Sequence, residues 1–468
     1  MHRLFFFIIF IFFFGISISK TDEDSFFSGG ETTNIANNKN AFSLVAKNLE
    51  EYLKIDFLVG NALFERIWED AQVSKNDTKD GLGPFFSASS CEQCHSGDGR
   101  GHLPDENFGD IDSISAVIQI GRVKKGKIEL LKYIPDQVYG SQISEFSVKN
   151  ALKEADIIFK YDYKPEMFNN GIIVELRKPT ILLKNLNYGK IGEDTKFSAR
   201  IAQPIIGLGL IESISDLDIL SNEDELDLNK DGISGKANRV WDIISNKETI
   251  GRFGWKASQP TVYQQIADAF FNDMGLSNTL HENPSNCSKF QTICNQIPNG
   301  NSVEYNDLEV SNEQLDLITF YSKQLGVPAR RNINDKDVIA GKKIFYELSC
   351  HSCHVEKFQT SNNAEYDNLK KQTIYPYSDF LLHEMGEGLA DSLSEFLANG
   401  NEWRTPPLWG LGLTETVSGR QSYLHDGRAR TITESILWHG GEAEEIKKDF
   451  LKLDVIQLNS VLKFLESL

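Results

Sequence analysis

The sequence carries one short pattern twice: two cysteines three positions apart, followed at once by a histidine. The first copy is Cys91, Cys94 and His95 in SASSCEQCHSGDGRG, and the second is Cys350, Cys353 and His354 in ELSCHSCHVEK. Two thiols on one helical turn are spaced to bond both vinyl groups of a haem, and the adjacent histidine is placed to ligate its iron. The sequence therefore predicts two covalently bound haem c groups, the first on His95 and the second on His354.

Two other uses of paired cysteines fit the sequence less well. A thioredoxin-like redox site requires a βαβ context, which neither copy of the pattern has. A zinc site built from both cysteine pairs would use all four thiolates and leave both histidines without a role.

The N-terminus has the proportions of a secretory signal. It reads MHRLFFFIIFIFFFGISISK, in which one arginine precedes an apolar core from Leu4 to Ile16. A core of this length is too short to cross a bilayer comfortably. We therefore expect residues 1–19 to be a signal peptide, the rest of the chain to be exported to the periplasm, and no stable membrane span to remain after cleavage. An uncleaved N-terminal anchor is the alternative.

The third cysteine pair is not followed by histidine. Cys287 and Cys294 stand in NCSKFQTIC. Because export makes disulfides permissible, we expect these two residues to close a small disulfide loop at the surface.

Charge limits the choice of partner. The formal net charge is −19 and we find no basic run, whereas binding to a nucleic-acid backbone requires a concentrated basic face. Nucleic acid is therefore excluded, and a basic protein or a small molecule is expected instead.

The chain divides around the two motifs. With 468 residues, 40% of them hydrophobic, it has the material for roughly two or three cores. Residues 20–44 are polar and read as a flexible leader. Residues 45–330 are expected to form an N-terminal haem domain with a large insertion, in which alternating runs near 112–185 predict strands. Residues 331–468 are expected to form a second domain, with a helix leading into its motif and an apolar stripe on the last helix.

The motifs and their surroundings resemble the bacterial di-haem oxidoreductase family. The stretches that carry the resemblance are GLGPFFSASSCEQCHSGDGRG, PIIGLGLIESI, DGISGKANRVWD, GRFGWKASQPTVYQQIADAFFNDMG, EWRTPPLWGLG and LHDGRARTITESILWHGGEAE. This family, labelled peroxidase or thiol oxidoreductase, is related to the di-haem cytochrome c peroxidases. The resemblance implies a mainly α fold of two cytochrome c-like domains, the first with a β-containing insertion.

The resemblance also suggests a second ligand for the second haem. In the related peroxidases a methionine at a set distance after the histidine of an HDG motif ligates this haem. Here HDG begins at His425, and His439 stands at that distance. A capping pair, Thr431 and Glu434, and the spacing of Ile432 and His439 predict a helix that turns His439 toward a buried surface. A core histidine without an iron is the alternative, and His383 and Met385 are competing ligands.

The first haem has no such candidate nearby. His102 is too close to His95 in the chain to reach the opposite haem face, so an open or labile sixth position is expected. Met274 is the alternative ligand. The sequence identifies no acid or base for peroxide cleavage. Trp255, in GRFGWKA, is either an aromatic bridge between the haems or ordinary core packing.

The segment DLNKDGISGKAN resembles the start of a calcium loop. Asp227, Asn229 and Asp231 alternate before a glycine, as in an EF-hand, but the twelfth place is Asn238 instead of glutamate. Asp242 is a possible substitute ligand. Calcium binding and an ordinary Asx-rich turn both remain open.

These features together predict a periplasmic di-haem c-type oxidoreductase. We expect it to act as a peroxidase, with a peroxide or oxygen-type oxidant reduced at the first haem and electrons relayed through the second. The donor would be a small electron-transfer protein or a small-molecule reductant. Two alternatives remain: a di-haem electron carrier without catalysis, and a haem-based binding or sensory protein.

Overall fold

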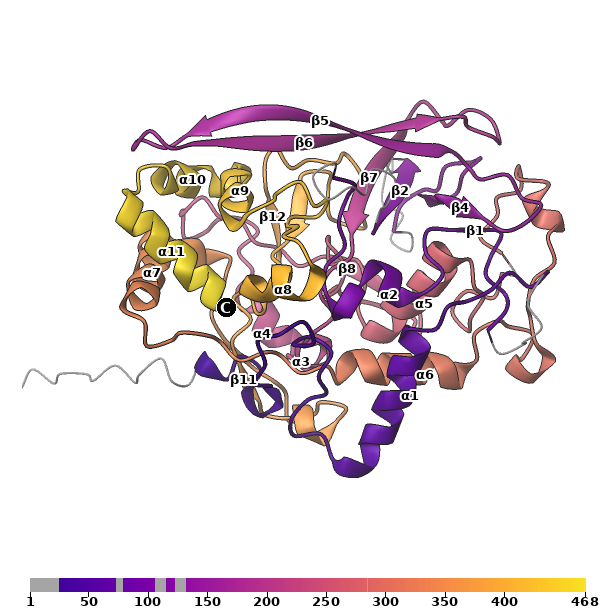
Figure 1. Ribbon diagram of the computed structural model, residues 1–468, viewed down its shortest axis with the longest axis horizontal. Coiled ribbons are helices and arrows are strands. Elements are labelled where there is room, and N and C mark those ends of the chain that lie inside the picture. Colours follow the sequence, from indigo (N-terminus) through magenta and orange to yellow (C-terminus); the bar gives the residue numbers. More distant parts are fainter. Residues whose placement is uncertain (1–24, 73–78, 106–114, 123–131, 284) are drawn as a thin grey trace, which may run out of the picture.

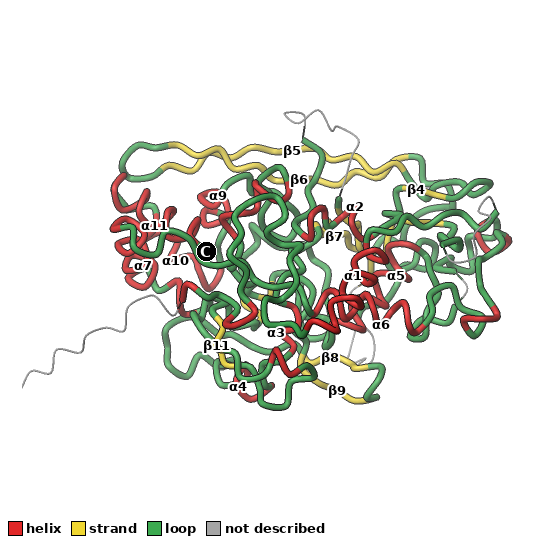
Figure 2. Tube along the Cα trace, turned by 60° about the horizontal axis from the view of Figure 1, so that its bottom comes forward, coloured by secondary structure: helices red, strands yellow, loops and turns green. Residues whose placement is uncertain are grey.

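The helices of the chain form two groups with loops between them. The computed structural model describes residues 25–72, 79–105, 115–122, 132–283 and 285–468. One group contains α1 (Lys54–Phe64), α2 (Cys91–Cys94), α5 (Val262–Met274) and α6 (Asn312–Lys323) (Figures 1 and 2). The other contains α7 (Lys336–Glu347), α9 (Ile432–Leu437), α10 (Glu444–Phe450) and α11 (Val455–Ser467). The predicted signal peptide lies outside the described residues. Among those residues, no helix has the length and apolar character needed to cross a membrane.

Few of the helices are long. The longest are α1 (Lys54–Phe64), α5 (Val262–Met274), α6 (Asn312–Lys323), α7 (Lys336–Glu347) and α11 (Val455–Ser467). The shorter ones are α2 (Cys91–Cys94), α3 (Leu208–Glu212), α4 (Asp216–Leu220), α8 (Thr414–Ser418), α9 (Ile432–Leu437) and α10 (Glu444–Phe450). Short 3-10 turns cover Gly30–Thr32, Glu51–Leu53, Ser96–Asp98, Cys294–Gln296, Val303–Tyr305, Cys350–Ser352, Asp367–Leu369, Leu411–Leu413 and Gly441–Ala443.

The strands form small antiparallel sheets. They are β1 (Phe85–Phe86), β2 (Ala116–Arg122), β3 (Gln142–Ile143), β4 (Phe146–Ser147), β5 (Asp156–Met167), β6 (Ile173–Lys184), β7 (Thr195–Ile201), β8 (Arg239–Asp242), β9 (Lys247–Ile250), β10 (Phe358–Gln359), β11 (Thr373–Ile374), β12 (Leu382–Glu384) and β13 (Glu402–Arg404). One sheet has the order β3-β2-β7, and the pairs are β1-β4, β5-β6, β8-β9, β10-β11 and β12-β13.

The β5-β6 hairpin links the two groups of helices. It arches over both of them in Figure 1. Near its tip, Phe168 is buried and packs edge-on against Phe450, with ring centroids 5.4 Å apart. A segment of the predicted insertion is thereby fixed to the helices around the second motif.

The expectation of a mainly α fold is wrong. The structure is 29% helical and 20% strand, with several small sheets. The helix expected before the second motif and the expected last helix are present as α7 and α11, but much of the rest of the described chain is loop (Figure 2). The full chain contains 35 glycines, which disfavour long helices. The alternating runs after the first motif pair with one another as strands.

The described part of the expected flexible leader, residues 25–44, is packed against the rest of the chain. Phe42 is 1% exposed and belongs to a buried cluster with Ile206, Val327 and Trp409. The backbone N–H of Asn34 also donates to the carbonyl of Val327 at 3.0 Å. The buried cluster around Phe42 contains residues from both sides of position 330, where we expected the first domain to end, so side chains of the two expected domains share one core.

Candidate functional site

The first motif forms one turn of helix with a fixed histidine after it. Ser90 caps α2, because its side chain accepts the N–H of Gln93. The imidazole Nδ1 of His95 donates to the carbonyl of Gln203 at 2.8 Å. This bond occupies Nδ1 and leaves Nε2 as the nitrogen for a metal. Burial lowers the pKa of His95 to about 4, so the ring is neutral, as an iron ligand must be.

The second motif has the same local arrangement. His354 follows the 3-10 turn Cys350–Ser352, and its Nδ1 donates to the carbonyl of Tyr377 at 2.9 Å. Burial lowers the pKa of His354 to about 4 as well. Both motif histidines are therefore neutral and oriented by a main-chain carbonyl.

All four motif cysteines are free thiols and are half-buried. Burial raises the pKa of Cys91, Cys94 and Cys350 to about 12, so these thiols stay protonated at neutral pH. They are neither disulfide-bonded nor held as thiolates, which leaves them available for thioether bonds.

Each motif histidine lies beside a crossing of two helices. At the first motif, α1 packs on α6, and a Cβ added at Gly60 would lie 2.4 Å from the carbonyl oxygen of Leu317 and 2.7 Å from the Cβ of Tyr321. Phe64, one turn after Gly60, has its ring 6.1 Å from that of His95 and tilted by 58°.

The second motif repeats this crossing with α7 and α11. A Cβ added at Gly341 would lie 1.9 Å from the carbonyl oxygen of Ser460 and 2.8 Å from the Cβ of Phe464. Phe345, one turn after Gly341, has its ring 6.3 Å from that of His354 and tilted by 55°. Both motifs thus have the same two neighbours: a glycine that permits close contact between two helices, and a phenylalanine whose ring lies beside the motif histidine.

A comparison with protein families agrees with this duplicated arrangement. A family model described as "Di-haem oxidoreductase, putative peroxidase" matches residues 23–116 and 139–468, which include both motifs. The chain belongs to this di-haem oxidoreductase family. It is therefore an oxidoreductase of a family that uses two haems. No curated protein and no solved structure matches it significantly.

The residues present suit the two haems of the family. Each motif supplies two free thiols and a neutral histidine whose Nδ1 is already bonded. Cys91 packs against the hydrophobic cluster that contains Leu63, and Cys350 packs against a different cluster, which contains Phe464. The two cysteine pairs are therefore not brought together in one zinc site. The described residues contain no group of three or more His, Cys, Asp or Glu side chains placed to bind a metal without a cofactor.

His439 lies near the second motif. Thr431 caps α9 by accepting the N–H of Glu434, but the Glu434 carboxylate accepts the N–H of Arg430 instead of completing a capping box. His439 follows the helix, and its Nδ1 donates to the carbonyl of Ser435 at 2.7 Å. Burial is the main reason that the pKa of His354 is lowered, and positive charge on His439 or on His383 would lower it further, so both of these imidazoles lie in the same region as His354.

The other residues that the sequence offered as haem ligands are bonded or packed elsewhere. Both nitrogens of His383 are bonded to carboxylates, Nε2 to Asp379 at 2.8 Å and Nδ1 to Glu442 at 2.7 Å. Met385 packs in an apolar cluster with Trp255 and Trp403. Near the first motif, Met274 is 3% exposed and packs in the core, and Nδ1 of His102 lies 3.2 Å from the carbonyl of Leu103.

His383 forms a buried charged group beside the second motif. Its Nδ1 lies 3.6 Å from Sγ of Cys353, and its side chain is 2% exposed. Burial alone would lower its pKa, but the charges and hydrogen bonds of Asp379 and Cys353 together outweigh burial and raise the pKa well above its usual value. At neutral pH, His383 is therefore an imidazolium between two carboxylates.

The raised pKa predicts how stability depends on pH. Protonated His383 contributes its full stabilisation below the unfolded pKa of about 6.5, and the contribution falls as pH rises through the folded pKa. Between these two values the loss is about 1.4 kcal/mol per pH unit. Urea unfolding from pH 6 to 9 should therefore show a shallower decline for His383→Gln than for the natural chain. Parallel profiles would contradict the charge assignment.

Trp255 lies in an apolar cluster that reaches toward both motifs. It is 8% exposed, and its Nε1 donates to the carbonyl of Ile201 at 2.9 Å. The same cluster holds Leu103, which follows the first motif in the chain, and Trp438, which precedes His439. This position is compatible with both core packing and a route between the two sites.

The segment with the calcium-like spacing is an exposed loop. Asp227 accepts the N–H of Gly232 at 3.2 Å, and the Asn229 amide donates to Asp231 at 3.1 Å. Asn238, in the twelfth place, is fully buried, and its amide donates to the carbonyl of Lys256 instead of pointing into the loop. Asp242 accepts from Ser245, so it closes its own turn.

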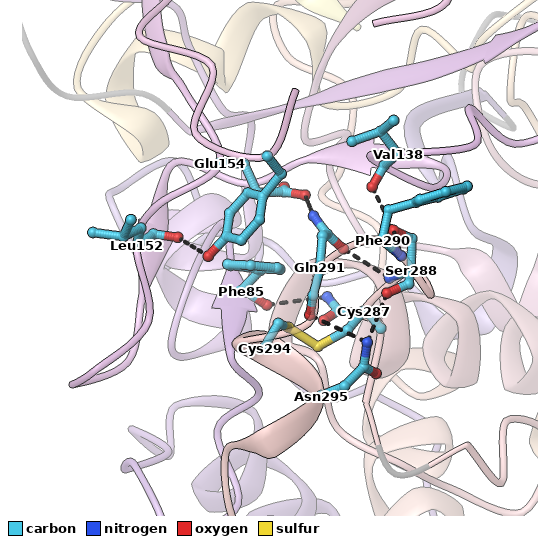
Figure 3. The surroundings of a disulfide bond; sticks show 12 residues. Phe85, Val138, Leu152, Glu154, Cys287, Ser288, Phe290, Gln291, Cys294 and Asn295 are labelled. Atoms are coloured by element: carbon cyan, nitrogen blue, oxygen red, sulfur yellow. Dashed lines mark hydrogen bonds between the residues drawn. A yellow bond between two sulfur atoms is a disulfide. The ribbon is translucent and has the colours of Figure 1, made fainter. Parts of the chain in front are cut away.

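Cys287 and Cys294 are joined in a disulfide (Figure 3). Cys294 is 1% exposed, whereas Phe290 and Ile293 between the two cysteines are 48% and 44% exposed, so the disulfide closes a loop at the surface. Between the two cysteines, Gln291 donates to Glu154 at 2.5 Å, and Ser288 donates to the carbonyl of Val138 at 2.5 Å. The disulfide therefore holds a loop against the strand-rich insertion.

Several residues of the sites were not found from sequence. The carbonyl groups of Gln203 and Tyr377 carry no side-chain signal and become visible only in the fold. His425 was recognised in the sequence only as the start of the HDG motif, and its stacking on Trp403, with ring centroids 3.7 Å apart, was not expected. One signal was readable: both helices that lead to the motifs contain Gly-x-x-x-Phe, at Gly60 and Gly341.

Proposed function

We propose that this oxidoreductase is an exported, periplasmic di-haem c peroxidase that reduces a peroxide at the first haem with electrons relayed through the second. The observation that carries the proposal is the difference between the two sites. At the second motif, His439 is an additional imidazole whose Nδ1 is bonded to the carbonyl of Ser435, which leaves Nε2 as the nitrogen for a metal. At the first motif, Met274 is packed in the core, and Nδ1 of His102 lies beside the carbonyl of Leu103. An iron with two protein ligands transfers electrons, and an iron with one has a position for an oxidant.

Each part of the chain has a distinct task in this proposal. Cys91, Cys94, Cys350 and Cys353 hold the two haems covalently. When bound, the haems supply the two electrons that convert a peroxide and two protons to water or to water and an alcohol. Burial keeps the proximal imidazoles neutral, and the carbonyls of Gln203 and Tyr377 orient them, so that each Nε2 would be available to an iron.

The route between the two sites passes through the cluster around Trp255. This cluster includes residues next to both motifs, and aromatic side chains in contact provide a covered path without water. The donor is a small electron-transfer protein or a small-molecule reductant. The disulfide at Cys287 and Cys294 supports export, because such bonds persist in an oxidising compartment.

Resting-state electron paramagnetic resonance combined with a turnover assay tests this function. We expect one low-spin ferric signal from the second haem, one high-spin signal from the first, and steady peroxide-dependent oxidation of a reduced small-molecule donor. Two low-spin signals without turnover would make the protein an electron carrier. A high-spin signal without turnover would make it a binding or sensory protein.

We further propose that the loop with Asp227, Asn229 and Asp231 binds calcium. The support is the alternation of oxygen-bearing side chains before Gly232. Metal analysis after dialysis without chelator should find bound calcium, and EDTA should lower the melting temperature by a few degrees, about the effect of a loss near 1 kcal/mol. A metal-free protein whose melting is unchanged by EDTA would identify the loop as an Asx-rich turn.

A further inference from the structure

Arg404, the last residue of β13, is a buried cation held by neutral groups. It is 5% exposed, and its guanidinium donates from Nε to the carbonyl of Gly254 at 2.9 Å and from Nη1 to the carbonyl of Thr405 at 3.3 Å. Its Nη2 donates to Oε1 of Gln203 at 2.8 Å. Burial lowers the pKa of Arg404 to about 10, an effect that the charge of Asp379 opposes only in part, so the guanidinium is still positive at neutral pH. A buried charge is normally paired with an opposite charge, which makes three neutral acceptors unusual.

On one side, Arg404 holds the segment that orients His95. The Gln203 side chain accepts from Arg404, and the Gln203 carbonyl accepts from Nδ1 of His95 at 2.8 Å. One residue therefore connects the guanidinium to the imidazole through two hydrogen bonds. A shift of Gln203 would turn the His95 ring, and the orientation of a ligating imidazole tunes the metal that it binds.

On the other side, Arg404 reaches the segment that orients His354. The Thr405 carbonyl that accepts from Arg404 also accepts from Oγ of Ser378 at 2.7 Å. Ser378 follows Tyr377, whose carbonyl accepts from Nδ1 of His354. Tyr377 has a φ of 52°, a left-handed conformation that is unfavourable for a bulky residue and persists only where neighbouring contacts hold it. The bond from Ser378 to Thr405 is one of these contacts.

Arg404 also fixes the main chain around Trp255. Its backbone N–H donates to the carbonyl of Trp255 at 2.9 Å, and its Nε donates to the carbonyl of the preceding residue, Gly254. Trp403, which precedes Arg404, packs in the same apolar cluster as Trp255. A single arginine is thus bonded to the anchor of the first histidine, to the tryptophan segment and, through Thr405, to the anchor of the second histidine.

We propose that Arg404 is a positioning residue for both haem sites, and that its positive charge favours the reduced state of the first haem. It holds the Gln203 carbonyl toward His95 and connects it through Thr405 to the segment that orients His354. A fixed positive charge two hydrogen bonds from an iron ligand stabilises the ferrous state, which carries one positive charge fewer than the ferric state. The proposal requires the two haems of the family but not peroxide turnover, so it is tested separately from the proposed function.

A potentiometric titration of the purified di-haem protein tests the charge, with the electron paramagnetic resonance signal of each ferric haem as the readout. Arg404→Gln should lower the equilibrium constant for reduction of the first haem about tenfold, which is about 59 mV for a one-electron couple. The second haem should shift less, because Arg404 reaches its anchor only through Thr405. The double variant Cys91→Ser with Cys94→Ser, which keeps only the second haem, assigns the two signals.

The matched control for the charge is Arg252→Gln. Arg252 is 6% exposed, and its guanidinium donates to the carbonyl of Ile211 and to Asp216, which belong to neither histidine anchor. This variant also loses a buried guanidinium, but both reduction potentials should stay at those of the natural chain.

Arg404→Lys separates position from charge. Lysine keeps the positive charge but cannot make the three bonds of the planar guanidinium. The potential of the first haem should therefore stay near that of the natural chain, whereas its electron paramagnetic resonance signal should change because the His95 ring is no longer held in one orientation. Gln203→Glu tests the same contact from its other end, since a carboxylate would neutralise Arg404 and should lower the first potential as Arg404→Gln does.

Circular dichroism establishes which variants are folded. If Arg404→Gln does not fold, Gln203→Glu decides the question of charge. An unchanged first potential in Gln203→Glu, or an equal shift in Arg252→Gln, would overturn the proposal. An unchanged signal in Arg404→Lys would also overturn it, because the position of Gln203 would then not depend on the guanidinium.

Discussion

Gly341→Ala should lower the free energy of unfolding by about 3 kcal/mol, the upper part of the range for overpacked sites. The added methyl group would lie 1.9 Å from the carbonyl oxygen of Ser460, and a backbone atom cannot turn aside as a side-chain end can. Relief requires α7 and α11 to separate, which would loosen Phe345 and Phe464 against each other. Urea unfolding followed by circular dichroism measures the loss.

Gly388→Ala is the matched control for this prediction. A Cβ at Gly388 would meet only ordinary contacts, 3.6 Å from the ring of Trp438. This variant should unfold within about 0.5 kcal/mol of the natural chain. If Gly341→Ala proved equally mild, the close crossing of α7 and α11 would not be a feature of the folded protein.

His439→Ala should abolish the low-spin signal of the second haem. The variant removes the imidazole that lies close to His354, so the iron would lose its second protein ligand and become high-spin or bind a substitute. His439→Met should restore six-coordination but raise the reduction potential of this haem, because a thioether favours the ferrous state more than imidazole does. Electron paramagnetic resonance and a redox titration measure the two effects.

Met385→Leu serves as the control for His439. Leucine keeps the volume and packing of Met385 in the cluster with Trp255 but lacks sulfur. An unchanged spectrum in this variant, together with a changed one in His439→Ala, supports His439 as the ligand. The opposite pattern would assign the ligand to Met385.

The sequence was sufficient to recognise the di-haem oxidoreductase family but not to predict the fold around the motifs. The cysteines and histidines of the motifs are defined by contiguous spacing, which is readable in one dimension. The cap of α6 is a local feature of the same kind, since Ser311 and Gln314, three positions apart, form a complete capping box.

The fold class was not readable in the same way. The mainly α fold was expected from the resemblance to the family, whereas the small sheets depend on long-range pairing, such as that of β2 with β7. The carbonyls that orient His95 and His354 come from Gln203 and Tyr377, and a main-chain group leaves no trace in residue identity. The glycines at the two close helix crossings, Gly60 and Gly341, can be recognised in the sequence, but only when the two halves of the chain are compared.

The most direct test of the account is the intact mass of the purified, denatured protein. Two haems joined through Cys91, Cys94, Cys350 and Cys353 should add about 1.2 kDa to the mass of the chain, and the red colour should stay with the protein after extraction with acidified acetone. Replacing Cys91 and Cys94 with serine should remove half of the added mass. A chain of unmodified mass whose colour passes into the acetone would contradict the account.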